Sequence, residues 1–306
     1  MAASSSFPFP SRHPVRTSFS VGAIVLIVFA FVPAIAVVVV SFTNLKGLPN
    51  LPVDWIGIEN YARYFGPARR SDNINALTNT LVFATLATVF QIGIGLAVAI
   101  LLNRPLKGRN FYRSIVFMPT VLGVTVTALI WSLMFNTSGG PIQSILNAFG
   151  TESAFFGDDN IALYLVVFCQ VWMQLGVTVI IFLSGLQAIP SDLYEVAGID
   201  GANSWQRFRY VTIPMLAPSI TANVLLGIVN AMQSYQLTYV LTGQSNKATQ
   251  LLSLQVYEQA FGNAQGRQMP GATQGYAAAI SMIQFVLVGA ITFATLWYLR
   301  RREAKL

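Results

Sequence analysis

The chain has 306 residues, of which 54% are hydrophobic and only 9% are charged, and its formal net charge is +7. A soluble globular domain carries about 25% charged residues, so this composition excludes an ordinary soluble protein. A charge left in hydrocarbon costs several kcal/mol, and a membrane environment explains the scarcity directly. We therefore expect an all-α integral membrane protein.

Runs of about 20 apolar residues mark transmembrane helices, and six such runs predict about six of them. They lie near residues 21–42, 77–102, 114–135, 161–186, 213–232 and 276–299. The first run exceeds the roughly 7–15 residues of a signal-peptide core, so we interpret it as a retained helix. Residues 1–18 are then an N-terminal tail that contains the sole histidine, His13, and residues 19–306 form one transmembrane domain.

The distribution of Lys and Arg predicts the orientation, because cytoplasmic loops are enriched in both. With a cytoplasmic N-terminus, six spans divide the basic residues twelve inside to six outside. The loop 136–160, on the outside, has none. We expect both termini to be cytoplasmic.

The six apolar runs contain no Asp, Glu, Lys or Arg. Ion-coupled transporters often place such a residue at the midplane, so a stand-alone secondary transporter is the less favoured alternative. The sequence has no Walker-type ATP-binding motif, and any ATP hydrolysis must occur on another chain. Its single cysteine, Cys169, lies inside a span, and no cysteine/histidine spacing indicates a metal. We expect no catalytic residues, no metal and no cofactor in this chain.

A polar loop, residues 190–214, separates the fourth and fifth spans. It predicts two short helices arranged as an L. Ser191 is the expected N-cap of the first helix, Gly201 interrupts the chain, and Asn203 or Asp200 caps the second. Small residues in the first helix would let the backbone of another protein approach closely.

This loop resembles the EAA motif of ABC importer permeases. Glu195-Val196-Ala197 stands for Glu-Ala-Ala, Gly201 follows at the family spacing, and Val211-Thr212-Ile213-Pro214 completes the motif. The resemblance implies a coupling helix that docks on a separate ATPase subunit. The residues that it marks are Glu195, Ala197, Asp200, Gly201 and Pro214.

Further segments resemble the carbohydrate-uptake, maltose-type members of that family. They are residues 57–61, residues 103–113 with Pro119, and Tyr235 with residues 239–243. Residues 262–275 look like an insertion before the last span. The resemblance implies a permease subunit for a sugar or sugar-like solute in a bacterial plasma membrane. The implied partners are a second permease subunit, two ATPase subunits and an extracytoplasmic solute-binding protein. The alternative within the family is another small polar solute, such as a polyamine or a phosphate ester.

Polar residues inside the spans predict a solute pathway, since amides, hydroxyls and aromatic rings are the groups that bind sugars. Residues one turn apart share a helix face, which groups Gln170, Gln174 and Thr178 on the fourth span. The fifth span and its outer end supply Asn223, Asn230, Gln233, Ser234 and Tyr235, and the sixth supplies Ser281 and Gln284. For each of these residues taken singly, a hydrogen bond between helices is an equally good interpretation.

Overall fold

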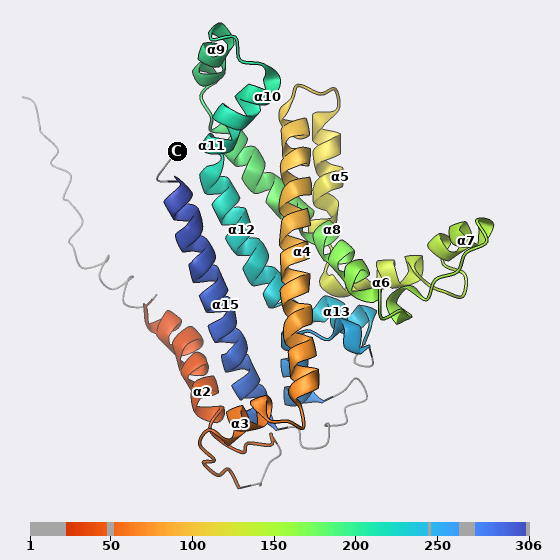
Figure 1. Ribbon diagram of the computed structural model, residues 1–306, viewed down its shortest axis with the longest axis vertical. Helices are drawn as coiled ribbons and strands as arrows, with labels where there is room; N and C mark the ends of the chain where they lie inside the picture. Colours follow the sequence, from red (N-terminus) through yellow and green to blue (C-terminus); the bar gives the residue numbers. More distant parts are fainter. Residues whose placement is uncertain (1–22, 48–51, 244–245, 263–272, 304–306) are drawn as a thin grey trace, which may run out of the picture.

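A computed structural model describes residues 23–47, 52–243, 246–262 and 273–303. The predicted tail 1–18 and most of the predicted insertion at 262–275 lie outside these residues. The described parts form an all-helical bundle without a named strand (Figure 1). Its long helices are Ala23–Val40, which includes η1 (Ile27–Phe31) and α2 (Val32–Val40), and α4 (Arg70–Asn103), α8 (Ala162–Gln187) and α15 (Gln274–Glu303).

Two further spans are bent pairs of helices. In one pair, α5 (Arg109–Val121) and α6 (Val124–Met134) meet at 101°. In the other, the segment Ser204–Met215 meets α12 (Ala217–Met232) at 66°. Counting each pair as one span, the six crossings match the six predicted apolar runs.

The third predicted span, 114–135, is not the continuous helix that its composition indicated. Leu122 and Gly123 are extended, with ψ angles of 136° and 152°. Glycine and β-branched valines are poor helix formers, and Pro119 has already removed one backbone hydrogen bond. An apolar run indicates that a segment lies in lipid, but it does not show whether the helix is bent.

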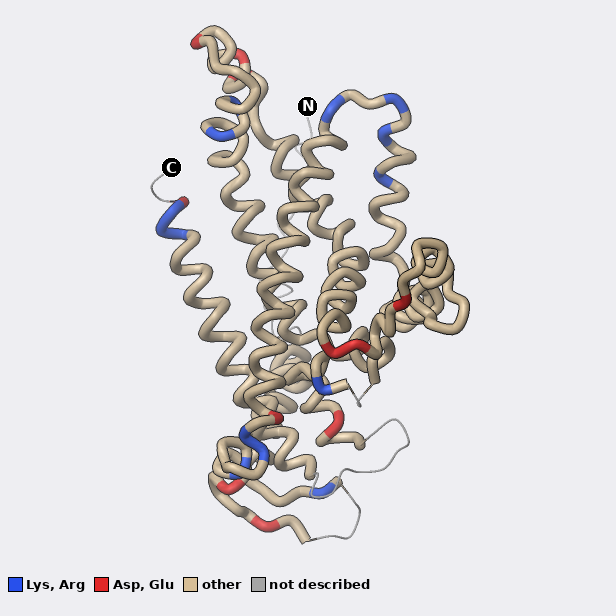
Figure 2. Tube along the Cα trace, turned by 45° about the vertical axis from the view of Figure 1, so that its right-hand side comes forward, with Lys and Arg blue, Asp and Glu red and all other residues tan. Residues whose placement is uncertain are grey.

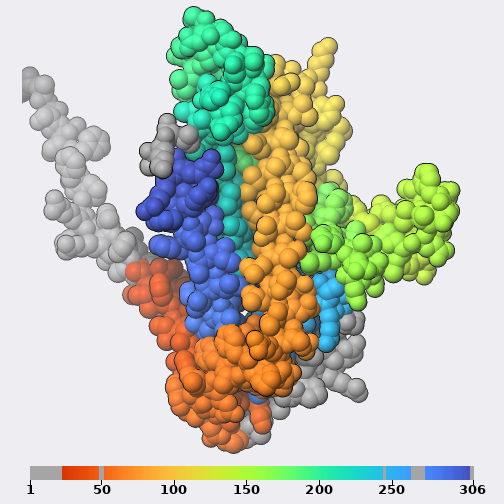
Figure 3. Space-filling model, viewed as in Figure 1, coloured from red at the N-terminus to blue at the C-terminus, as the bar shows by residue number. Residues whose placement is uncertain are grey.

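Short helices close both ends of the bundle. One end, here named the coupling end, carries α9 (Ser191–Ile199), α10 (Ser204–Arg207) and the last turns of α15 (Figure 1). The opposite end carries α3 (Glu59–Phe65), α13 (Gln236–Leu241) and α14 (Leu252–Phe261). Beyond α6, the helix α7 (Pro141–Ala148) projects sideways from the bundle (Figures 1 and 3).

The centre of the bundle is the packing of α4 against α8. Small residues allow this close approach, as is common between membrane helices. Gly95 lies so close to Thr178 that a Cβ at position 95 would overlap the threonine side chain. Around this contact, Phe83, Val166 and Phe182 are completely buried.

The outer surface of the bundle is apolar and its charges lie at the ends. No residue of the helix Ala23–Val40 is buried, although α2 contacts α15. Lys, Arg, Asp and Glu gather at the two ends, and Asp and Glu also lie on the projecting arm around α7 (Figure 2). A lipid environment explains an apolar belt between two charged ends.

Candidate functional site: a coupling loop and a polar recess

The loop between α8 and α12 folds as two short helices at the coupling end. Gly201 has a φ of +76°, in the left-handed region, and makes the turn between them. Asn203 caps α10 in a capping box with Gln206, as predicted. The N-cap of α9 is Pro190 and not Ser191, which is the first helical residue and donates a hydrogen bond to Asp192.

Two hydrogen bonds tie the loop into one unit. The Tyr194 and Thr212 hydroxyls lie 3.0 Å apart and join α9 to η3 (Phe208–Thr212), the segment that follows α10. The Arg207 Nε donates to the carbonyl of Ala202 at 2.9 Å, across the turn. The first bond thus links α9 to the start of the fifth span, and the second links α10 to the turn.

The loop presents large apolar side chains to the outside. Glu195, Asp200 and Gly201 are exposed, whereas Ala197 and Pro214 are half-buried. The most exposed large residues nearby are Ile199 at 86%, Tyr210 at 74% and Trp205 at 68%. The sequence predicts that small residues form the contact surface of this loop, and the prediction did not include these three large side chains. The signal that could have found them is the presence of large apolar or aromatic residues in a segment that is otherwise polar or small.

A polar recess of about 530 Å³ lies between α8, α12 and α13, with Val124 of α6 at its edge. It brings together six of the seven predicted pathway residues: Gln170, Gln174, Asn230, Gln233, Ser234 and Tyr235. Sequence analysis missed its apolar members Met173 and Leu237 and the amide of Gln236. Amides, a hydroxyl and an aromatic ring thus converge from helices that are far apart in the sequence.

The polar side chains of the recess differ in whether they already have a hydrogen-bond partner within the protein. Gln170 is buried and accepts a 3.3 Å bond from the Ser234 hydroxyl. Gln174 is half-buried and Asn230 is exposed, and neither amide has a hydrogen-bond partner among the described residues. Free amides in a recess are available to water or to a solute.

Thr178, the seventh predicted pathway residue, does not line the recess. Its hydroxyl is buried and accepts a 2.6 Å hydrogen bond from the Gln91 side chain of α4. The position therefore serves helix packing, although it shares a helix face with Gln174. Asn223 is also buried in the bundle and is absent from the recess lining.

The sixth span contributes to a second recess of about 760 Å³ between α12 and α15. Ser281 and Gln284 line it, and Gln233 lines both recesses. Gln284 donates to the Met232 carbonyl at 2.8 Å and so supports the end of α12. Gln233 is the residue through which the two recesses adjoin.

None of the residues that line the two recesses is His, Cys, Asp, Glu, Lys or Arg. Within the described residues no cluster of three His, Cys, Asp or Glu side chains is placed to hold a metal ion. Cys169 is completely buried in α8. The arrangement can bind and pass a polar solute through hydrogen bonds.

Comparison with known proteins identifies the family. The profile described as "Binding-protein-dependent transport system inner membrane component" matches residues 91–303, which include the coupling loop and both recesses. The chain belongs to this family. It is a permease, a transport component of the bacterial inner membrane, and not an enzyme.

Relatives of this permease match along nearly the whole chain. The multiple sugar-binding transport system permease protein MsmF of Streptococcus mutans is 33% identical, covering 90% of this chain and 91% of its own. The trehalose/maltose transport system permease protein MalF of Thermococcus litoralis is 32% identical, with coverages of 89% and 88%. The sn-glycerol-3-phosphate transport system permease protein UgpA of Agrobacterium fabrum is 30% identical, with coverages of 97% and 98%.

Solved structures confirm the fold of the permease. A chain of a bacterial ABC transporter involved in the import of the acidic polysaccharide alginate superimposes with a TM-score of 0.79. The match covers 94% of this permease and 95% of that chain at 21% identity. The bundle with its two bent spans is therefore an ABC importer permease fold.

Proposed function

We propose that this permease forms part of the membrane pathway for a neutral sugar or sugar-like solute in an ATP-driven importer. Two of its relatives, MsmF and MalF, are named as sugar transport permeases. The partners in this proposal are a second permease subunit, two ATPase subunits and an extracytoplasmic solute-binding protein. Energy comes from the ATPase pair, because this sequence carries no ATP-binding motif.

The polar recess is the observation that carries the proposal. Ligand sites are concave and combine apolar walls with a few placed polar groups. The recess offers the amides of Gln174, Asn230 and Gln233 and the ring of Tyr235 beside Met173 and Leu237. Sugar hydroxyls need both donors and acceptors, and a carboxamide supplies both.

The absence of charge in the recess favours a neutral solute. UgpA is named for sn-glycerol-3-phosphate, a phosphate ester. Recognition of a phosphate ordinarily uses Arg or Lys, and a polyamine would call for a carboxylate. None of the ten residues that line the recess is charged.

The coupling loop is the proposed contact with the ATPase. Glu195, Asp200 and Gly201 are exposed at the tip of the loop, next to the apolar side chains of Ile199 and Trp205. In protein interfaces, most of the affinity comes from a few large side chains that become buried in the partner and are surrounded by polar residues. Ile199 and Trp205 are candidates for this role. Ala197 and Pro214 support the loop from inside, where both are half-buried.

The charge distribution supports a cytoplasmic coupling end. Among the described residues, the coupling end has nine Lys and Arg, namely Arg104, Lys107, Arg109, Arg113, Arg207, Arg209, Arg300, Arg301 and Arg302. The opposite end has five, namely Lys46, Arg63, Arg69, Arg70 and Lys247. Excess positive charge remains on the cytoplasmic side, and this supports the proposal that both termini are cytoplasmic.

The experiment is uptake by the full importer in proteoliposomes. The permease is reconstituted with its partner permease, its ATPase and its solute-binding protein, and labelled solutes are supplied with ATP inside or outside. We expect uptake of a neutral saccharide that requires ATP at the coupling end. Uptake of sn-glycerol-3-phosphate alone, or ATP-independent uptake, would contradict the proposal.

A further inference from the structure

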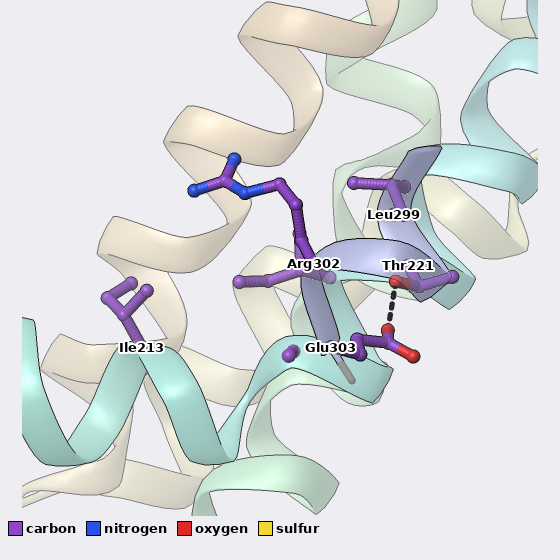
Figure 4. Close-up of a pocket in the computed structure, with 7 residues that line it drawn as sticks. Ile213, Thr221, Leu299, Arg302 and Glu303 are labelled. Atoms are coloured by element: carbon purple, nitrogen blue, oxygen red, sulfur yellow. Dashed lines mark hydrogen bonds between the residues drawn. The ribbon is translucent and has the colours of Figure 1, made fainter. Parts of the chain in front are cut away.

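A separate recess of about 410 Å³ lies at the coupling end, between the fifth span and the last turns of α15. Its wall is apolar and consists of Ile213, Ala217, Ile220 and Leu299. Its rim carries the polar side chains of Thr221, Arg302 and Glu303 (Figure 4). No step of the proposed solute pathway uses this recess.

The two charged residues of the rim are not paired with each other. The Glu303 carboxylate accepts a hydrogen bond from the Thr221 hydroxyl, and the Arg302 guanidinium points away from it (Figure 4). Among the described residues Arg302 forms no ion pair, and its recorded ring contact, with Tyr298, is long at 6.0 Å. The recess therefore offers a free guanidinium above an apolar floor.

The position along α15 is that of a membrane–water boundary. The apolar part of the helix ends at Leu299 and is followed at once by three arginines. Trp297 and Tyr298 are 51% and 57% exposed. Aromatic side chains concentrate at the headgroup level of a bilayer, which puts the rim among headgroups and the apolar wall among acyl chains.

We propose that this recess binds one anionic phospholipid. Its phosphate accepts charge-assisted hydrogen bonds from Arg302, which are about twice as strong as neutral ones. The upper part of an acyl chain lies along Ile213, Ile220 and Leu299. Basic pockets between membrane helices bind anionic headgroups, and the apolar wall excludes a soluble anion as the preferred ligand.

The site also adjoins the coupling loop. Ile213 lies in that loop, Ala217 begins α12, and the 66° bend lies between them. A lipid that contacts the coupling loop, α12 and α15 together stabilises one arrangement of these three elements. The bound headgroup thus acts on the element that is proposed to transmit ATPase movement.

The test is native mass spectrometry of the detergent-purified importer complex with phosphatidylglycerol added. Arg302→Ala is compared with Arg301→Ala, which removes the same charge one residue away. Arg301 stacks on Trp297 at 3.8 Å and does not line the recess. We expect Arg302→Ala to lower phosphatidylglycerol affinity about tenfold, as loss of a charged hydrogen bond does, and Arg301→Ala to leave it nearly unchanged.

Two further arms make the outcome decisive. Ala217→Leu, which fills the apolar wall and keeps Arg302, should lower the affinity as well. Phosphatidylcholine should bind more weakly than phosphatidylglycerol. Equal losses for the two arginine variants, no preference for the anionic lipid, or displacement by glycerol phosphate at equal concentration would overturn the proposal.

Discussion

At the scale of single residues, two neighbours on one helix face have different environments. Gln174 opens into the polar recess, whereas Thr178, one turn further on, is buried against Gln91 of α4. Both side chains are uncharged and can donate and accept hydrogen bonds. Their roles differ because a neighbouring helix covers one of them.

Truncating the recess amides should impair transport without unfolding the protein. Neither Gln174 nor Asn230 has a hydrogen-bond partner among the described residues, so Gln174→Ala and Asn230→Ala strand no buried group. We expect the melting temperature of the complex to shift little while uptake falls. The measurement is thermal unfolding beside sugar uptake in membrane vesicles. Destabilised complexes whose folded fraction transports normally would refute the pathway role.

Thr178→Ala should show the reverse behaviour. It leaves the buried Gln91 amide without its acceptor, at a cost of about 1–3 kcal/mol in stability. Uptake per folded molecule should stay near normal, and Thr178→Ser should restore stability. A pathway role for Thr178 would appear instead as lost uptake in a complex of unchanged melting temperature.

Glu258 of α14 should make stability depend on pH. The side chain is buried, and burial raises the pKa of its carboxyl from 4.5 to about 7, against the effect of a hydrogen bond from Gln250. A raised pKa means that the folded protein holds the proton more tightly than the unfolded chain. The stabilisation is therefore complete below pH 4.5 and is lost as the pH rises through about 7.

The rise in the pKa of Glu258 sets an upper limit of about 3 kcal/mol on the change in the free energy of unfolding with pH. Glu258→Gln keeps the shape of the side chain and removes its titration. We expect the melting temperature of the complex to fall between pH 5 and pH 8, and to fall less in the variant. The check is thermal unfolding across that range, and identical slopes for both proteins would contradict the assignment.

At the scale of elements, the coupling loop is an L of two short helices that precedes the bend of the fifth span. Its L shape depends on the left-handed turn at Gly201 and on the bond between Tyr194 and Thr212. The bend at Leu216 lies between the loop and α12. In the proposed function, the bend is the place where movement of the loop would change the angle of the fifth span.

Substitution at Gly201 should uncouple transport from ATP hydrolysis. No atom lies within 4 Å of a Cβ built there, so the bulk of Gly201→Trp would point outward to the proposed ATPase. The left-handed backbone adds strain of about 1–2 kcal/mol, which Gly201→Ala measures alone. We expect the tryptophan variant to insert normally but to lose ATP-dependent uptake and co-purification of the ATPase.

Gly150→Trp is the matched control for this prediction. Gly150 also has a positive φ, +70°, with open space around it, but it lies beyond α7 and away from the coupling loop. Its variant should keep the ATPase bound. Normal uptake and ATPase recovery in Gly201→Trp would disprove the docking surface.

At the scale of the whole molecule, orientation can be tested by chemical labelling. Ser204 is exposed at the coupling end and Glu152 is exposed on the projecting arm, whereas the native Cys169 is completely buried. We expect Glu152→Cys to react with a membrane-impermeant maleimide in spheroplasts. Ser204→Cys should react only after permeabilisation. Reversed reactivity would require the opposite orientation.

Much of this permease was predictable from local patterns. Apolar runs predicted six spans, which agrees with the helices of the described residues when each bent pair counts as one, and the fixed spacing from Glu195 to Pro214 predicted the coupling loop. Asn203 predicted a helix cap and Gly201 predicted a turn, and the structure confirms both. Such features depend on residues within a few turns of one another, so the sequence alone determines them.

Tertiary structure decided which of the predicted residues meet. Gln174 of α8 and Asn230 of α12 line the same recess. Thr178 instead forms a hydrogen bond with Gln91, and Thr221 forms one with Glu303. The 101° bend after α5 was equally hidden in an unbroken apolar run. Periodicity assigns a side chain to a face of its own helix, but the rotation and packing of all the helices decide whether that face contacts another helix, lipid or a water-filled recess.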